Sequence, residues 1–203
     1  MNKDPYLDDN GVLINLLGLT DEKELDRAEE DISYLKLLNI DSILPEKCDY
    51  EHMLAIHKHI FGDIYEWAGR IRIIPIVKGE RVLGGDTVRY SHPENIERDA
   101  KIVIDDMNAV DWLSLSNRDK AERMTKLIAR LWQTHPFREG NTRTIINFMI
   151  QLAETKGFKM DVDLFKNNPK YTRNALVKAS DGEYSDYQYL VKIIEDSIDN
   201  ESN

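Results

Sequence analysis

Residues 135–143 of the chain read His135-Pro136-Phe137-Arg138-Glu139-Gly140-Asn141-Thr142-Arg143, a polar stretch between two strongly apolar segments. The segment before it has apolar residues at the spacing of one buried helix face, namely Met124, Leu127, Ile128, Leu131 and Trp132. The segment after it is apolar without a polar stripe, as in a central helix wrapped by others, through Ile145, Ile146, Phe148, Met149, Ile150 and Leu152. The polar stretch is therefore predicted to be a loop that joins two core helices.

The residue types of this loop favour the binding of an anion. Asn141 is predicted to cap the second helix, so the backbone N–H groups at the helix start would point into the loop with the positive end of the helix dipole. Arg138 and Arg143 add charge-assisted donors, and Glu139 is a hard oxygen ligand suited to Mg²⁺ on bound phosphates. An unperturbed histidine titrates near neutral pH, so His135 is a candidate general base.

The loop resembles the signature of the Fic family (filamentation induced by cAMP), written HxFx(D/E)GNGRxxR. The resemblance implies a mainly α fold, a Fic-type helical bundle, that transfers AMP from ATP to a protein hydroxyl with the help of Mg²⁺. It implies that His135 is the general base, that Phe137 anchors the loop in the core and that Glu139 binds the metal. The implied nucleotide- and phosphate-binding positions are Arg138, Gly140, Asn141, Thr142 and Arg143.

Two positions depart from the family signature. Thr142 stands where glycine is usual, and Ile146 stands where a second arginine is usual. In the family that arginine contacts the terminal phosphate and pairs with an inhibitory glutamate, and the loss of one charged hydrogen bond weakens binding by roughly 1.5 to 3 kcal/mol. Three interpretations stay open: an AMP transferase, a nucleotide-binding regulatory module without turnover, and an enzyme that transfers a phosphoryl or phosphocholine group instead.

A second region of resemblance lies upstream of the loop. Residues 61–70 resemble the segment before the flap of small, toxin-like Fic proteins, and the alternating apolar pattern that follows predicts a β-hairpin over residues 70–83. In the family, the edge of this hairpin pairs with the target protein. The implied docking residues are Ile73, Ile74, Lys78 and Gly79. The alternative is a structural hairpin that only covers the core.

The rest of the pattern is helical and undivided. Apolar residues at helical spacing predict further helices over about residues 21–38, 53–61, 96–107 and 187–198. No internal repeat or long linker interrupts the 203 residues. We expect one domain over residues 1–203, with a Fic-like core at about 50–180 and flanking N- and C-terminal helices.

Composition limits the partners. The formal net charge of −10 argues against general nucleic-acid binding. No signal-peptide pattern and no apolar run of membrane-spanning length is present, so we expect a cytoplasmic protein without membrane contact. The single cysteine, Cys48, excludes an intramolecular disulfide. The resemblance implies a target protein with a Tyr, Thr or Ser hydroxyl.

Inhibition is the least defined property. The family's inhibitory motif, (S/T)xxxE(G/N), is matched in its first five positions by residues 20–24, 42–46 and 197–201, and none of these is followed by Gly or Asn. The sequence therefore leaves two options, a separate small antitoxin-like inhibitor or no glutamate switch.

Other candidate residues lie outside the loop. His52, His57 and His59 share a predicted helix, but their spacing does not fit a zinc helix. The resemblance makes His92 a candidate neighbour of the target. Tyr171 and Asn174 either line the base pocket, as in relatives, or lie on a helix surface.

Overall fold

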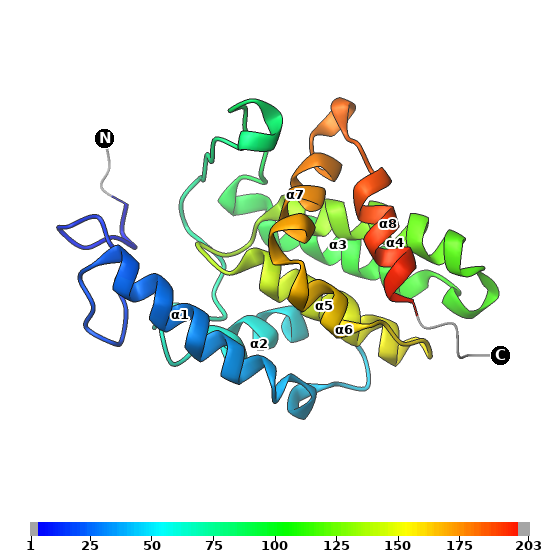
Figure 1. Ribbon diagram of the computed structural model, residues 1–203, viewed down its shortest axis with the longest axis horizontal. Coiled ribbons are helices and arrows are strands. Elements are labelled where there is room, and N and C mark those ends of the chain that lie inside the picture. Colours follow the sequence, from blue (N-terminus) through cyan, green and yellow to red (C-terminus); the bar gives the residue numbers. More distant parts are fainter. Residues whose placement is uncertain (1–3, 199–203) are drawn as a thin grey trace.

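A computed structural model describes residues 4–198 of the chain, and it is built almost entirely from helices (Figure 1). The described residues form eight α-helices: α1 (Glu22–Leu37), α2 (Tyr50–Phe61), α3 (Ile96–Ala109), α4 (Asn117–Thr134), α5 (Asn141–Thr155), α6 (Val162–Asn167), α7 (Pro169–Ala179) and α8 (Gln188–Ser197). Short 3-10 helices lie at Ile40–Ile43, Arg81–Leu83, Pro93–Asn95, Trp112–Ser114 and Gly182–Tyr184. The mainly α prediction is confirmed. Residues 199–201 of one inhibitory-motif match lie outside the described residues.

Side-chain caps fix where the helices begin. Asp21 accepts a hydrogen bond from the backbone N–H of Glu24 at the start of α1, and Asp49 accepts one at the start of α2. Ser116 does the same for α4, and Asp161 for α6. Each cap satisfies a backbone donor that has no partner inside its helix.

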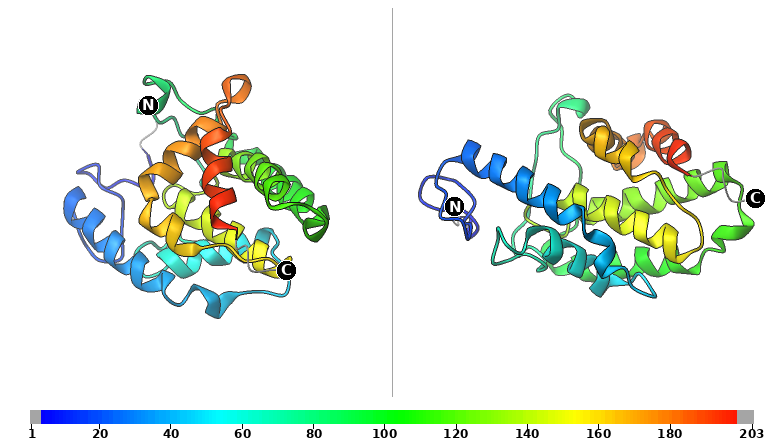
Figure 2. Two further views of the ribbon diagram at one scale, coloured as in Figure 1. Left: turned by 45° about the vertical axis from the view of Figure 1, so that its right-hand side comes forward. Right: turned by 60° about the horizontal axis from the view of Figure 1, so that its bottom comes forward.

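Helix α5 lies at the centre of the bundle, as its apolar sequence predicts. It packs against α2 and α4, while α3 and α8 cover other faces of α4, and α1 packs on the outside of α2 (Figures 1 and 2). Ile145, Phe148, Met149 and Leu152 of α5 are completely buried. The loop between α4 and α5 is therefore attached to two helices that carry many buried residues.

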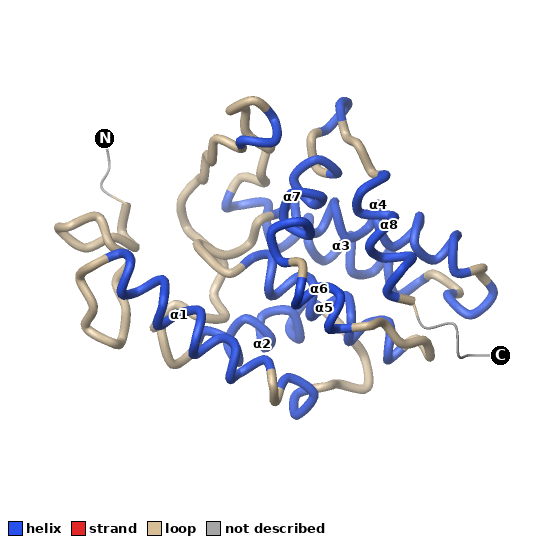
Figure 3. The backbone as a smooth tube through the Cα atoms, in the orientation of Figure 1, coloured by secondary structure: helices blue, strands red, loops and turns tan. Residues whose placement is uncertain are grey.

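The predicted β-hairpin over residues 70–83 is absent. Figure 3 draws this region as a loop with one short helical turn, and the only β contacts among the described residues are the isolated bridges Leu7–Leu13 and Met160–Ile198. Ile73 and Val77 are 71% and 80% exposed, and among the described residues no partner strand pairs with the alternating apolar pattern. The N–H of Glu80 donates to the carbonyl of Asp86 at 2.7 Å and closes the tip of the loop.

Two composition-based expectations can be compared with the fold. Cys48 is completely buried, and burial raises the pKa of its thiol to about 11, which makes it a poor nucleophile. Within residues 4–198, none of the helices combines the length and the apolar character needed to cross a bilayer.

Candidate active site in the loop between α4 and α5

Left-handed backbone at both ends shapes the loop. Helix α4 ends at Thr134, and His135 follows with a φ of 45°, while Gly140 has a φ of 80° directly before α5. A side chain at Gly140 would overlap the ring of Phe61, so the loop needs glycine there for both its conformation and the space. The two turns bring residues 136–139 across the N-terminus of α5.

Asn141 has a different role from the one predicted. Gly140 is the N-cap of α5, and Asn141 is its first residue. The side-chain amide of Asn141 accepts a hydrogen bond from the N–H of Phe137 at 2.9 Å and donates one to the carbonyl of Phe137 at 2.8 Å. It therefore holds the loop closed, and the backbone N–H groups of the first turn of α5 are the candidate anion donors at this end.

The buried side chain of His57, on α2, contacts two residues of the loop. Phe137 is completely buried and stacks on the ring of His57, with ring centroids 3.8 Å apart. The N–H of Gly69 donates to Nδ1 of His57, so Nε2 carries the hydrogen and donates to the carbonyl of Glu139 at 3.1 Å. Burial lowers the pKa of His57 to about 3, which keeps this donor neutral. This support was not predicted from the sequence.

The other two histidines of α2 also bond separately. His52 contacts Oε1 of Gln151 at 2.7 Å, and His59 bonds the carbonyl of Lys36 at 3.0 Å. Among the described residues, no group of three or more His, Cys, Asp or Glu side chains could hold a metal ion.

His135 is held as a neutral imidazole with both nitrogens free. Its side chain is buried, and neither ring nitrogen has a hydrogen-bond partner. The ring stacks on Tyr90 with centroids 4.1 Å apart and meets the edge of Trp132. Burial, followed by the positive charges of Lys78, Arg72 and Arg173, places the pKa of His135 well below its ordinary value. The imidazole is therefore unprotonated at neutral pH, which is the form that a general base needs.

Glu139 is the carboxylate of the loop, and it is ionised. One oxygen accepts from the N–H of Gly140 at 3.0 Å, and the other lies 3.5 Å from Nζ of Lys78. Burial raises the pKa of Glu139, but Lys78, the Gly140 N–H and the arginines at 138 and 143 together bring it below its ordinary value. Its side chain is 37% exposed, so an ionised carboxylate is accessible to solvent.

Both arginines of the loop are paired with carboxylates from the N-terminal part of the chain. Arg138 bonds Oδ2 of Asp4 at 3.0 Å. Arg143 pairs with Glu29 of α1, donates to Oγ of Ser33 at 2.7 Å and lies over the ring of Phe61. These acidic partners were not predicted, because they precede the loop by more than one hundred residues.

The two departures from the signature have structural explanations. Oγ1 of Thr142 accepts a hydrogen bond from the indole N–H of Trp132 at 3.1 Å, which ties the first turn of α5 to α4. Ile146 is only 5% exposed and belongs to the core. The first side chain is therefore used by the fold, and the second does not lie among the solvent-accessible groups of the loop.

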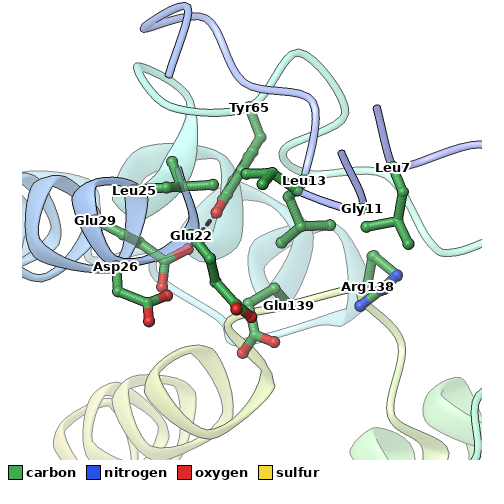
Figure 4. Close-up of a pocket in the computed structure, with 11 residues that line it drawn as sticks. Leu7, Gly11, Leu13, Glu22, Leu25, Asp26, Glu29, Tyr65, Arg138 and Glu139 are labelled. Carbon is green, nitrogen blue, oxygen red and sulfur yellow. Dashed lines mark hydrogen bonds between the residues drawn. The ribbon is translucent and has the colours of Figure 1, made fainter. Parts of the chain in front are cut away.

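A cavity of about 400 Å³ lies beside the loop, on the side that faces α1 and the N-terminal segment. Figure 4 shows Glu22, Asp26 and Glu29 projecting from α1 toward the space next to Glu139 and Arg138. The imidazole of His135 does not line this cavity.

Residues 71–92, hereafter the cover segment, also contact the loop. Lys78 reaches Glu139, Ile73 is exposed, and Ile74 and Gly79 lie at or near the surface. The buried carboxylate of Glu80 receives two hydrogen bonds from Arg173 of α7, at 2.8 and 2.9 Å. This ion pair, which was not predicted from the sequence, holds the cover segment against α7.

The remaining candidates, His92, Tyr171 and Asn174, lie outside the loop. His92 pairs with Glu94 at the surface, 3.5 Å away. Tyr171 is 41% exposed, and its hydroxyl donates to the carbonyl of Tyr189 at 3.2 Å, while Asn174 is half-buried. The position of Tyr171 favours the helix-surface interpretation over the base pocket.

Comparison with known proteins identifies clear relatives. The model of the Fic/DOC family matches residues 47–153. The protein adenylyltransferase VbhT of Bartonella schoenbuchensis is 36% identical over 165 residues, which cover 80% of this chain and 33% of that protein. The probable protein adenylyltransferase y4lH of Sinorhizobium fredii is 34% identical over 179 residues, 85% of each chain. This chain therefore spans one third of the first relative and most of the second.

Solved structures share the fold. The BepC protein of Bartonella tribocorum, crystallised with bound AMPPNP, matches 96% of this chain with a TM-score of 0.79 and 23% sequence identity. An N-terminal Fic domain from Bartonella quintana, crystallised with bound ADP, matches the same share with the same TM-score. At this level of identity the likeness concerns the fold.

Proposed function

The chain belongs to the Fic/DOC family, and from this premise we propose that it is a protein adenylyltransferase that moves AMP from ATP to a hydroxyl side chain of another protein. The observation that carries the proposal is His135. Its imidazole is neutral and buried, and neither ring nitrogen has a hydrogen-bond partner. Four residues later the ionised carboxylate of Glu139 lies just before the N-terminus of the central helix α5. Relatives named protein adenylyltransferases add support.

The residues of the loop suit the parts of such a reaction. The N–H groups at the start of α5, with Arg138 and Arg143, would hold the phosphates of ATP. His135 would take the proton of the target hydroxyl as its oxygen attacks the α-phosphorus, and the bond to pyrophosphate would break. Most of the rate enhancement would come from positioning and charge neutralisation.

Glu139 fits the requirements of Mg²⁺. The ion prefers oxygen ligands, keeps several waters and is commonly held by one or two carboxylates together with substrate phosphates. Glu139 is ionised and partly exposed, and it lies beside the predicted phosphate position. When bound, Mg²⁺ neutralises phosphate charge, and Lys78 would exchange its contact with Glu139 for one with the nucleotide.

The cover segment is the proposed docking surface for the target. Ile73 and Val77 present apolar side chains to solvent, next to Ile74, Lys78 and Gly79. The Glu80–Arg173 pair fixes one end of this surface against α7. A target chain lying along it would bring its hydroxyl toward His135, since Lys78 already contacts the loop.

Labelled ATP tests the proposed function. The purified chain is incubated with Mg²⁺ and bacterial lysate proteins, using ATP labelled on either the α- or the γ-phosphate. Retention of the α-label alone on protein supports AMP transfer. Retention of the γ-label shows phosphoryl transfer and contradicts the proposal.

A regulatory nucleotide-binding module is the second candidate, favoured by the occupied arginines. Arg138 and Arg143 are both paired with carboxylates, and no second signature arginine is present. The labelling experiment decides between the two, because a module of this kind binds ATP in calorimetry and labels nothing.

Replacement of Glu139 tests the metal site. Glu139→Ala should bind ATP with a Mg²⁺ enhancement about tenfold smaller than that of the wild type, equivalent to about 1.4 kcal/mol, because one anionic ligand is lost. Calorimetry with and without Mg²⁺ measures the enhancement. Glu183→Ala, at an exposed position in a distant turn, is the matched control. Equal enhancement in all three proteins would remove Glu139 from the metal ligands.

Replacement of Glu29 tests the competition for Arg143. The carboxylate of Glu29 holds the guanidinium that the nucleotide would use, so Glu29→Gln should bind ATP more tightly, by up to about tenfold. Glu30→Gln, at the exposed neighbouring position of α1, is the control. It changes the net charge of the chain by the same amount as Glu29→Gln. Unchanged or weaker ATP binding by Glu29→Gln alone would show that ATP does not use Arg143.

A further inference from the structure

Arg72 is a buried guanidinium whose hydrogen bonds all end on backbone carbonyls. The residue is 1% exposed, and no ion pair to it occurs among the described residues. Its side chain donates to the carbonyls of His135 at 2.7 Å, Ile74 at 2.6 Å and Ser91 at 2.5 Å. Its backbone N–H donates to the carbonyl of Pro136 at 2.8 Å. One side chain thus joins both ends of the cover segment to the loop that carries the base.

Burial of this charge without a counter-charge is unfavourable. The hydrogen bonds from the side chain to backbone carbonyls therefore have to offset the desolvation of the guanidinium. The planar guanidinium offers five N–H donors in a fixed fork, which lets it serve several carbonyls that face different directions. A lysine would bring the same charge but only a single, movable donor centre. The geometry therefore depends on arginine itself, and not on positive charge alone.

The backbone that Arg72 holds is strained at the base. His135 is the only described residue other than glycine with a positive φ, a conformation that persists only where surrounding contacts enforce it. Its N–H donates to the carbonyl of Trp132, and its own carbonyl accepts from Arg72. The carbonyl of Ser91, also held by Arg72, directly follows Tyr90, whose ring stacks on His135.

We propose that Arg72 is a positioning residue that fixes the imidazole of His135 between the loop and the cover segment. The inference rests on the proposed role of His135 as the base. Arg72 itself need not touch the nucleotide or the target. It acts through the His135 carbonyl and through the segment that places Tyr90 against the ring.

The charges around the imidazole give a second readout. Lys78 and Arg72 come from the cover segment, Arg173 comes from α7, and the stacked Tyr90 is the neighbouring titratable group. Removal of one positive charge should raise the pKa of His135 toward its ordinary value, whereas replacement by lysine should keep most of the lowering.

The test compares Arg72→Lys and Arg72→Met with Arg70→Met, a change at an exposed position two residues earlier. Thermal melts and ATP calorimetry identify folded variants that keep the nucleotide site. Single-turnover transfer of the α-labelled group should fall about 10²-fold in Arg72→Lys at unchanged ATP affinity, because a displacement of about 1 Å at a catalytic group has this effect. Arg70→Met should match the wild type.

Histidine NMR separates a positioning role from a merely structural one. In folded Arg72→Lys the imidazole signals of His135 should shift while those of His52 and His57 stay, and in Arg72→Met the His135 titration should move to higher pH. Folded Arg72→Lys with wild-type transfer and unchanged His135 signals would overturn the inference. If His135→Ala transfers AMP normally, the proposed role of His135 as the base fails instead, and the NMR shifts still report whether Arg72 positions the ring.

Discussion

His135→Ala should fold normally and transfer AMP about 10²- to 10⁴-fold more slowly than the wild type, the usual effect of removing a positioned base. The imidazole makes no hydrogen bond through its ring, so its removal leaves no buried partner unsatisfied. Its ring stacks on Tyr90 and meets the edge of Trp132, and the contact between Tyr90 and Trp132 remains without it. The expected loss is therefore chemical and not structural.

Single-turnover labelling with α-labelled ATP measures this loss, and a thermal melt checks the fold. His59→Ala is the control, since His59 lies on α2, bonds the carbonyl of Lys36 and belongs neither to the loop nor to the cover segment. We expect the control to keep the wild-type rate. A His135→Ala protein that labels targets as fast as the control would exclude His135 as the base.

The pH dependence of the wild-type rate follows from the same environment. Because the pKa of His135 lies well below 6.5, the base is already unprotonated at pH 6.5. As the pH falls, the rate should stay level through 6.5 and decline only at more acidic values, where protonation begins. A decline with its midpoint at or above pH 6.5 would mean that another group limits the reaction.

The sequence predicted the loop well because its signals are local. Helical spacing on both sides located the two core helices. Gly140, between them, has a positive φ, which glycine adopts readily at a turn. The cap was misassigned to Asn141, since its side-chain amide suits a capping role and also fits the backbone of Phe137 four residues earlier. Local preference could not choose between these two uses.

The errors and omissions concern contacts between distant parts of the chain. The alternating pattern of residues 71–77 predicted strands, but Arg72 takes its acceptors from residues 91 and 135, and a local pattern carries no information about them. Likewise, helical spacing located α1 without indicating that Glu29 would reach Arg143, 114 residues away. These partners became visible only once the helices were packed.

The buried position of Ile146 leads to the largest expected effect on stability. Arginine would be the usual residue of the signature here, yet this side chain is 5% exposed within the core. Ile146→Arg would bury a guanidinium that has no carboxylate of its own, because Glu29 is already bonded to Arg143 and Tyr65. An uncompensated buried charge of this kind lowers the free energy of unfolding by about 3 to 5 kcal/mol.

Chemical denaturation of the apo protein measures this loss against two controls. Ile146→Val, which only shortens the side chain, should cost about 0.5 to 1.5 kcal/mol. Ile150→Arg, one turn later on α5 and only half-buried, should cost less than Ile146→Arg, because its charge can reach water.

The alternative result for Ile146→Arg is a stability near that of the wild type together with an increased ratio of ATP to ADP affinity. It would show that an arginine at 146 leaves the core and reaches the terminal phosphate. The predicted loss would instead mean that the chain must hold its phosphates without this contact, through the N-terminus of α5 and the arginines at 138 and 143.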